Sequence, residues 1–465
     1  MTEALWALDA TTTARMVAAG EVSASEVLEA HLRRIDSVNP RLNAIVRRAD
    51  DHARERAQEI DAGNVTGALA GAVMTTKINT DHVGFPTDNG IRALANHVPS
   101  GNHPCVTGLL DAGLVMAGRT NSPAFAMRCH TDNDLHGETL NPYDANLSCG
   151  GSSGGAGVAV ATGMCHVAQG NDVAGSIRWP SLMNGVIGLR PTIGRVPTGG
   201  VNPALPRGWS ATNMSTNGPL ARSMADVRAA FYAMSRDNWG DPLWVPAPHE
   251  FAPSRRPVRV TLVTNDEQGF APAVRDAVRR VGDVLASAGY DVHEGLPPMT
   301  ETLFGLWGRL GVLDLAHGLV PLLDQINDSG LRASITDWMR DLPPPTTEGF
   351  VKALADRDLV MRSWTTHLAE SPLIVTPLLD RVRLERGEDV AAPGAMSRIV
   401  NAGRWGINLS AIEMPALAFP TGLSDGTPLG VQLVARAWRE DLLLAAGDVL
   451  ERHYGAVRPV EVAWE

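Results

Sequence analysis

Apolar residues along this chain recur with two different periods, and each period predicts a different kind of element. In the first 65 residues they recur every three or four positions behind a capping-box pair, Ser23 and Glu26, which indicates a helix. Pro40 predicts the end of that helix. A second, charged helix is expected over residues 44–60.

From residue 71 to 200 the pattern changes to short apolar runs separated by glycine-rich turns. The runs at 114–118, 165–169 and 186–189 predict buried strands. Residues 119–123 are expected to lead from the first of these strands into a helix. Strands and short helices in this alternation are typical of an α/β protein.

The second half of the chain combines both patterns. It predicts strands at 259–263, 373–376, 416–419 and 430–434, helices at 274–288 and 441–453, a mostly helical 303–369 interrupted at 343–345, and a surface connection at 239–257. The sequence therefore predicts an α/β core with a largely parallel or mixed β-sheet, in about three domains by length alone or in one larger unit.

Composition narrows the class of protein. Hydrophobic residues make up 44% of the 465 residues and charged residues 20%, as in ordinary globular domains. The net charge of −11 argues against nucleic-acid binding, and no run of about 18 apolar residues predicts a membrane span. Without a secretory signal, the four cysteines are expected to be free thiols, and a cytoplasmic location is expected.

Lysine is almost absent from the chain. Of the 40 basic residues only Lys77 and Lys352 are lysines, which leaves 40 − 2 = 38 arginines. A single lysine is normally a solvated surface residue. In a chain that otherwise uses arginine, however, a remaining lysine can mark a site where the cation must lose its proton, which arginine does not do.

Two glycine-rich segments carry serines suited to catalysis. Residues 150–155 fit the G-x-S-x-G elbow around Ser152, although such loops often only permit close backbone approach. They lack the lysine of a phosphate-binding loop. Residues 170–178 place Ser176 at a turn whose backbone N–H groups can converge as an oxyanion hole; the alternative is an ordinary turn with Arg178 in a salt bridge.

Lys77, Ser152 and Ser176, in this order and within these segments, resemble the amidase signature family of serine amidohydrolases. The resemblance is strong over about residues 71–200 and weaker over most of the chain. It implies a catalytic triad with Ser176 as nucleophile, Ser152 as bridging serine after a cis peptide bond, and Lys77 as base. It further implies an oxyanion hole from the backbone N–H groups of Val173, Ala174, Gly175 and Ser176. Supporting or substrate-lining residues are expected to be Ser153, Asp172, Arg178, Trp179 and Asn79.

The family resemblance also implies a reaction. It predicts hydrolysis of the C–N bond of a small carboxylic amide through a serine acyl-enzyme, without a cofactor or metal, in a monomer or homodimer that uses no nucleic acid or membrane. Carbamates, aryl-acylamides and the glutamyl-tRNA amidotransferase reaction are alternatives. On this interpretation residues 1–465 form one large α/β domain with a central mixed β-sheet flanked by helices on both faces. Residues 1–65 are its N-terminal helices, residues 71–200 the signature core, and residues from about 300 to 370 a variable helical cap over the substrate.

The sequence departs from the family pattern at a few positions. Ile78 stands where an acidic residue is usual, Asn171 where threonine is frequent, Ala174 where glycine is usual, and Trp179 where a small residue is more common. Trp179 is expected either in the core or in the substrate pocket. None of these changes removes a triad residue.

A metal-dependent amidohydrolase is the competing interpretation from another class. It rests on a cluster of candidate ligands, His130, Asp132, Asp134 and His136, with His97 and His103 nearby. Their spacing matches no standard site, and such residues in a polar loop more often form caps and turns.

Overall fold

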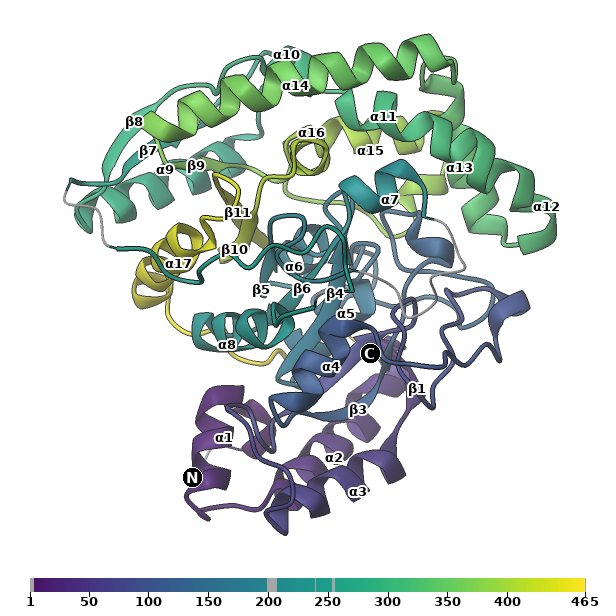
Figure 1. Cartoon of the computed structure of the whole chain (residues 1–465), viewed down its shortest axis with the longest axis vertical. Coiled ribbons are helices and arrows are strands. Elements are labelled where there is room, and N and C mark those ends of the chain that lie inside the picture. The colour runs from purple at the N-terminus through teal and green to yellow at the C-terminus, as the bar shows by residue number, and fades with distance from the viewer. Residues whose placement is uncertain (1–3, 199–206, 239, 253–255, 465) are drawn as a thin grey trace.

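One mixed sheet organises the molecule (Figure 1). The computed structural model describes residues 4–198, 207–238, 240–252 and 256–464. Within them the strands form an 11-stranded sheet in the order β1-β3-β2-β4-β6-β5-β10-β11-β9-β7-β8. Their bounds are β1 Ile45–Arg48, β2 Val73–Lys77, β3 Val115–Thr120, β4 Val167–Asp172, β5 Ile187–Arg190, β6 Thr216–Ala221, β7 Arg259–Leu262, β8 Asp291–Glu294, β9 Leu373–Thr376, β10 Ala416–Ser424 and β11 Thr427–Ala435. The pairs β2/β3, β2/β4, β7/β8 and β7/β9 are parallel, and the others are antiparallel.

Helices surround the sheet. They are α1 Ala10–Ala18, α2 Ala24–Leu42, α3 Asp50–Asp61, α4 Pro104–Asp111, α5 Gly154–Ala161, α6 Arg178–Met183, α7 Trp209–Asn213, α8 Met224–Met234, α9 Pro272–Ser287, α10 Thr300–Leu303, α11 Leu306–Asp314, α12 Leu323–Ile326, α13 Ser329–Asp341, α14 Thr347–Glu370, α15 Ala395–Ala402, α16 Arg404–Asn408 and α17 Glu440–Tyr454. Helices α10 to α14 lie together at one end of the molecule, and α1 to α3 lie at the other (Figure 1).

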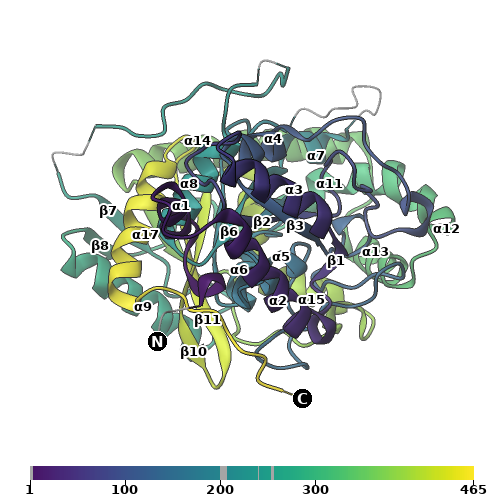
Figure 2. The same cartoon turned by 90° about the horizontal axis from the view of Figure 1, so that it is seen from below.

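Each face of the sheet has its own hydrophobic core, because successive residues of a strand point to opposite faces. On β2, Val73 lies in the core with α2 and α5, whereas the next residue, Met74, lies in the core with α4 and α8. Val115 and Met116 on β3 divide in the same way. Figure 2 shows α4 and α8 on one side of the strands and α2 and α5 on the other. The predicted α/β fold with a mixed sheet covered on both faces is confirmed.

The N-terminal region differs from its prediction in two places. Helix α2 does not end at Pro40 but continues to Leu42 and stops at Asn43, which has a φ of 51°. The prediction of a helix over 44–60 is wrong at its start, because residues 45–48 form the edge strand β1 and helix α3 begins only at Asp50. Residues 45–48 form a strand because they pair with β3, beginning with Ile45 opposite Thr120. Ile45 and Val46 are β-branched, and hydrogen bonds to the free edge of β3 stabilise them more than a further helical turn would.

Other elements follow the predictions more closely. The strands expected at 373–376, 416–419 and 430–434 are β9, β10 and β11, and helix 303–369 is broken at its prolines between α13 and α14. After β3 the predicted helix is wrong, since the chain forms only a 3₁₀ turn at Ala124–Ala126 and then loops to α5. Part of the connection predicted at 239–257, and residues 199–200, lie outside the described residues.

One helical stretch of the described residues, Thr300–Ile326, is long and apolar enough to cross a membrane by length and composition alone. In the fold it is not a single straight helix. It consists of α10, α11, a π-helical turn at Leu315–Leu319, a 3₁₀ turn at Val320–Leu322 and α12, and its first segments pack on α14. Leu306 and Trp307 of α11 are buried.

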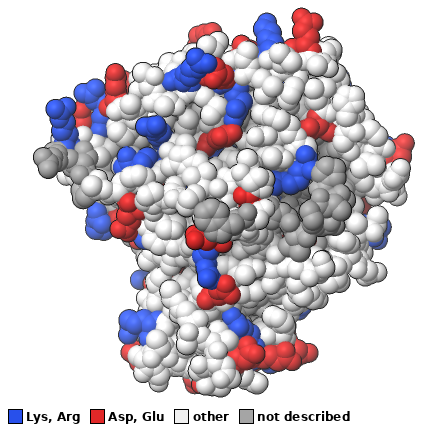
Figure 3. All heavy atoms as spheres, in the orientation of Figure 1, with Lys and Arg blue, Asp and Glu red and all other residues white. Residues whose placement is uncertain are grey.

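Charged side chains on the surface are mixed in sign. On the face shown in Figure 3, basic and acidic residues are interspersed, with uncharged atoms between them. Surface arginines commonly pair with carboxylates, for example Arg48 with Asp36 and Asp50, and Arg228 with Asp448. That face therefore presents no extended patch of one sign.

The topology brings the candidate catalytic segments to one edge of the sheet. Strands β2 and β4 are parallel neighbours, so their carboxyl ends meet at the same edge. Lys77 is the last residue of β2, and Asp172 is the last residue of β4. The turn that carries Ser176 follows β4, and the loop that carries Ser152 ends where α5 begins at Gly154.

Candidate active site

Lys77 lies completely buried at the end of β2, among neutral oxygen atoms. Its Nζ is 2.6 Å from Ser152 Oγ, 2.8 Å from Asn171 Oδ1 and 3.1 Å from Ser153 Oγ. Its backbone N–H donates to Gln169 Oε1 at 3.0 Å, which ties the end of β2 to β4. The structure thus places the two residues predicted as base and bridging serine in direct hydrogen-bond contact.

The loop that carries Ser152 is held tightly from both sides. The peptide bond between Gly151 and Ser152 is cis, as the family resemblance leads one to expect. A Cβ at Gly151 would lie 2.4 Å from the carbonyl oxygen of Arg128, so this position must be glycine. Ser153, which follows Ser152, donates its backbone N–H to the carbonyl oxygen of Ser176 at 3.2 Å. This bond joins the Ser152 loop to the turn that carries the candidate nucleophile.

Burial favours the neutral form of the Lys77 amine. Desolvation lowers the pKa of Lys77 well below its ordinary value, and the negative charge of Asp172 opposes that shift only in part. In the described part of the chain Lys77 has no carboxylate within ion-pair distance. Lowering a lysine pKa from about 10.4 to about 7 corresponds to roughly 4–5 kcal/mol of destabilised charge. A lysine in this environment is suited to act as a general base.

Asp172 fixes the shape of the nucleophile loop, residues 173–177. Its carboxylate accepts the backbone N–H groups of Gly175 at 2.7 Å and Ile177 at 3.2 Å. Arg178 donates to both of its oxygens, at 2.9 and 3.0 Å. Burial alone would raise the pKa of Asp172, but the guanidiniums of Arg178 and Arg190 and the N–H of Gly175 together outweigh it and lower that pKa to about 2. The carboxylate therefore stays ionised and holds the loop in one conformation.

The nucleophile loop offers fewer free N–H groups than the sequence predicts. The prediction names Val173, Ala174, Gly175 and Ser176 as oxyanion-hole donors. Gly175 has to be removed from this set, because its N–H is already bonded to the Asp172 carboxylate, a stronger acceptor than a neutral oxygen. The N–H groups of the other three donate to no acceptor within the residues that the structure describes. They remain the predicted donors.

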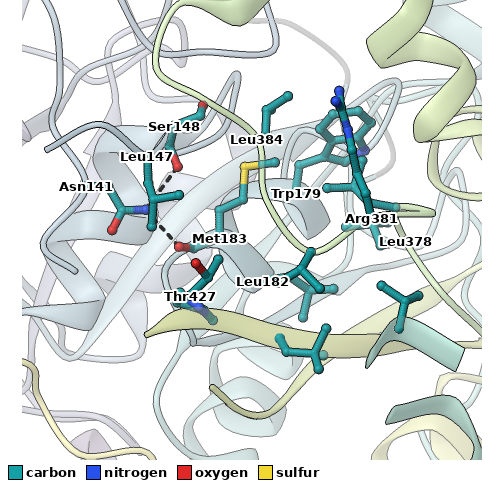
Figure 4. A pocket seen from close by; sticks show the side chains of 16 residues that line it. Asn141, Leu147, Ser148, Trp179, Leu182, Met183, Leu378, Arg381, Leu384 and Thr427 are labelled. Carbon is teal, nitrogen blue, oxygen red and sulfur yellow. Dashed lines mark hydrogen bonds between the residues drawn. The ribbon is translucent and has the colours of Figure 1, made fainter. Parts of the chain in front are cut away.

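Trp179 is both a core residue and the border of a pocket. Its side chain is 1% exposed and packs against three glycines. A Cβ would lie 2.2 Å from the indole at Gly175, 2.0 Å at Gly403 and 3.0 Å at Gly406. Gly175 also has a φ of +101°, which favours glycine. The indole borders a largely apolar pocket shown in Figure 4, whose lining includes Leu182, Met183, Leu378 and Leu384.

The helical region around residues 300–370 reaches the nucleophile loop through α11. The indole N–H of Trp307 donates to the carbonyl oxygen of Val173 at 2.6 Å. The Trp307 ring stacks on Trp338 of α13, with centroids 4.8 Å apart and planes inclined by 11°. Two aromatic rings from this region therefore lie beside the loop that carries Ser176. Its role as a substrate cap stays a prediction.

The residues of the proposed metal cluster are used in separate contacts. His130 bonds Glu138 at 2.7 Å, and His136 bonds Asp88 at 3.0 Å. Asp132 pairs with Arg128, Asp134 accepts from Ser329, and His103 caps α4. Within the described ranges no group of three or more such side chains is arranged to hold a metal.

Sequence reasoning gave Asn171 no role, yet its side chain contacts the candidate base. Gln169 and Asn171 are two residues apart on β4, so both point to the same side of that strand. Both side chains contact Lys77, one at its backbone N–H and one at Nζ. Strand spacing was the signal that could have placed them together. Asn79 also belongs here, since its Oδ1 accepts from Asn171 Nδ2 at 2.9 Å.

Comparison with known proteins agrees with this geometry. A family model described as Amidase matches residues 26–444. Indoleacetamide hydrolase of Bradyrhizobium diazoefficiens is 35% identical, over 97% of this chain and 88% of that protein. Acylamidase of Rhodococcus erythropolis is 30% identical, over 97% of this chain and 96% of that protein. The solved structure of 6-aminohexanoate cyclic dimer hydrolase complexed with substrate matches with a TM-score of 0.86 at 27% identity, over 98% of this chain and 99% of that chain.

Proposed function

This chain belongs to the amidase signature family and is an amide-hydrolysing enzyme, and from that premise we propose that it hydrolyses the C–N bond of a small linear carboxylic amide through an acyl-enzyme on Ser176. One observation carries the proposal: the buried amine of Lys77 lies 2.6 Å from the hydroxyl of Ser152, next to the nucleophile loop. A serine hydroxyl is a weak nucleophile until a base removes its proton. A buried, unpaired lysine in contact with a bridging serine supplies that base.

The proposed reaction moves one proton along the triad in each direction. Neutral Lys77 takes the proton of Ser152 while Ser152 takes that of Ser176, whose oxygen attacks the amide carbon. The oxyanion accepts hydrogen bonds from the N–H groups of Val173, Ala174 and Ser176. Lys77 then returns the proton through Ser152 to the leaving nitrogen, and ammonia or an amine departs. Water, activated by the same relay, releases the carboxylate.

We propose amides of aryl-substituted carboxylic acids as the substrate class. The relative at 35% identity carries the name indoleacetamide hydrolase. Buried aromatic side chains lie beside the nucleophile loop, since Trp307 bonds Val173 and stacks on Trp338. Apolar surroundings of this kind suit an aryl group better than a charged one. A primary amide would release ammonia, the smallest leaving group.

A substrate panel tests the proposal. Purified enzyme is incubated with indole-3-acetamide, phenylacetamide, an anilide, an aryl carbamate, an ester and glutamine, with mass-spectrometric readout and Ser176→Ala as the control. The largest kcat/KM is expected on the arylacetamides, and quenching during turnover should show an acyl adduct on the wild-type enzyme only. Hydrolysis of none of these C–N bonds would contradict the proposal.

Other outcomes of the same panel identify the alternatives. Preference for the carbamate or the anilide would move the substrate class to carbamates or aryl-acylamides on the same triad. Ammonia release from glutamine alone would favour the amidotransferase reaction. Loss of activity with a metal chelator, but not with a fluorophosphonate, would favour the metal-dependent alternative.

A further inference from the structure

The three oxygen atoms around Lys77 Nζ differ in what they can do. Asn171 Oδ1, at 2.8 Å, is an amide oxygen and can only accept hydrogen bonds. Ser153 Oγ, at 3.1 Å, can donate or accept, but its hydroxyl lies 3.4 Å from the carbonyl oxygen of Asn171 and donates there. Its oxygen therefore also faces Lys77 as an acceptor. Ser152 Oγ, at 2.6 Å, is the remaining neighbour.

This inventory determines the direction of the lone pair. A neutral amine has two N–H groups and one lone pair. Asn171 and Ser153 take the two N–H groups, so the lone pair of Lys77 is left pointing to Ser152, whose hydroxyl must donate to it. The oxygen of Ser152 is then available to accept a proton from Ser176. The hydrogen-bond polarity of the whole relay follows from the two acceptors that lie beside it.

The Asn171 side chain always presents its oxygen to Lys77, because its amide group cannot flip. Its Nδ2 donates to Asn79 Oδ1 at 2.9 Å. Asn79 Oδ1 also lies 3.4 Å from Thr80 Oγ1, which donates to it. A reversed Asn171 amide would place its oxygen against the oxygen of Asn79. That contact would be repulsive, so Asn79 holds the orientation.

We propose that Asn171, oriented by Asn79, is a positioning residue that directs the lone pair of Lys77 to Ser152. The inference deepens the proposed function and rests on it. After the proton moves, the ammonium of Lys77 has three N–H groups, and the same three oxygens accept them. No side chain has to rearrange between the two protonation states. Because an amide is neutral, it supplies the acceptor without the charge that would keep the proton on Lys77.

Asn171→Asp is the sharpest test, because it keeps the shape and an oxygen but adds a charge. A carboxylate 2.8 Å from Nζ should hold the Lys77 proton, so the acid limb of the kcat pH profile should move by about 1–3 units towards alkaline pH. At pH 7, kcat should fall about 10- to 1000-fold and recover at high pH, with little change in KM. Asn64→Asp, on an exposed turn after α3, adds the same charge away from the site and should leave the profile in place.

Variants at Asn79 test the orientation. Asn79→Asp keeps an oxygen for Asn171 Nδ2 and should shift the acid limb less than Asn171→Asp does. Asn79→Leu releases the Asn171 amide and should lower kcat by about 10-fold without a charge effect on the limb. If Asn171→Asp fails to fold, Asn171→Leu replaces it and should lower kcat by about 10- to 100-fold at unchanged KM. Wild-type kcat in Asn171→Leu would overturn the inference.

A substrate-free readout separates the two proposals. The rate at which a fluorophosphonate labels Ser176 is measured against pH for the wild type and for Asn171→Asp. If the wild type is not labelled at all, the proposed function fails. If the wild type is labelled and Asn171→Asp shows the same pH dependence, only the inference about Asn171 fails.

Discussion

Replacing Lys77 by arginine keeps the positive charge and removes the ability to lose it. Lys77 is fully buried, and its Nζ has oxygens at 2.6, 2.8 and 3.1 Å. An arginine at the same position would stay protonated near neutral pH. If Lys77 only balanced charge or filled space, Lys77→Arg would be a mild change. If it is the base, the change should be close to a deletion.

The size of the loss can be worked out from a neighbouring side chain. Arg119 is also fully buried, and its side chain donates to the carbonyl oxygen of Lys77 at 2.9 Å. Burial lowers the pKa of Arg119 to about 10. A base with a pKa of 10 is neutral in about one molecule in 1000 at pH 7. We therefore expect Lys77→Arg to lower kcat at pH 7 by at least about 1000-fold, with a tenfold recovery per pH unit up to about pH 9.

The assay is kcat against pH from 6 to 10 on the best substrate of the panel, together with the melting temperature of each variant. Lys352→Arg is the matched control, because it makes the same replacement at an exposed position of α14 and should leave kcat unchanged. Should Lys77→Arg fail to fold, Lys77→Met removes the amine without adding bulk and should be inactive at every pH. Retention of more than a tenth of the wild-type kcat at pH 7 by Lys77→Arg would refute the general-base role.

Three further outcomes are expected. Ser176→Ala should lose turnover by about 10⁴-fold or more and should no longer react with a fluorophosphonate, while an unchanged rate would exclude Ser176 as the nucleophile. Trp307→Phe keeps an aromatic ring but removes the hydrogen bond to Val173. For a bond of about 1–2 kcal/mol, kcat/KM should fall about 5- to 30-fold. A wild-type kcat/KM would show that this bond does not position the nucleophile loop. Burial lowers the pKa of His31 in the folded protein to about 3, so between pH 6.5 and 3 the proton binds to this residue only in the unfolded state. The free energy of unfolding should therefore fall by about 2 kcal/mol from pH 6.5 to 5. In chemical denaturation, His31→Leu should reduce the pH dependence of this free energy by about one proton, and an unchanged dependence would contradict this assignment.

The fold could be predicted where local patterns and tertiary pairing agree. The run at 373–376 consists of three apolar residues and a threonine between two prolines, and it forms β9 at those residues. β1 was not predicted because its four residues continue directly into the charged pattern of α3. Only the pairing of β1 with β3 makes these residues a strand rather than the first turn of that helix. β8 has the sequence Asp-Val-His-Glu, and its strand conformation comes from its place beside β7 at the sheet edge. Such long-range pairing leaves no local signal.

The candidate site divides in the same way. Ser152 and Ser176 stand in glycine-rich segments whose composition is constrained by close backbone approach, and Lys77 is one of only two lysines in the chain, so a single sequence reveals them. The hydrogen bond from Trp307 to Val173 joins residues that are 134 positions apart, and no local sequence pattern around either residue predicts it. Asn171 lay within a recognised segment, but its importance depends on which way its amide faces. That orientation is set by Asn79, on another strand end.

The use of lysine and arginine in this chain supports the role of Lys77. At most of its buried cation sites the chain places arginine with carboxylates: Arg178 bonds Asp172, and Arg404 bonds Asp266. Permanently charged guanidiniums suit such sites, because each neutralises a buried carboxylate. Lys77 differs from Arg178 and Arg404 in that its Nζ contacts only neutral oxygens. A permanent charge there would lack a partner, whereas an amine that is neutral at rest and charged only during proton transfer needs none.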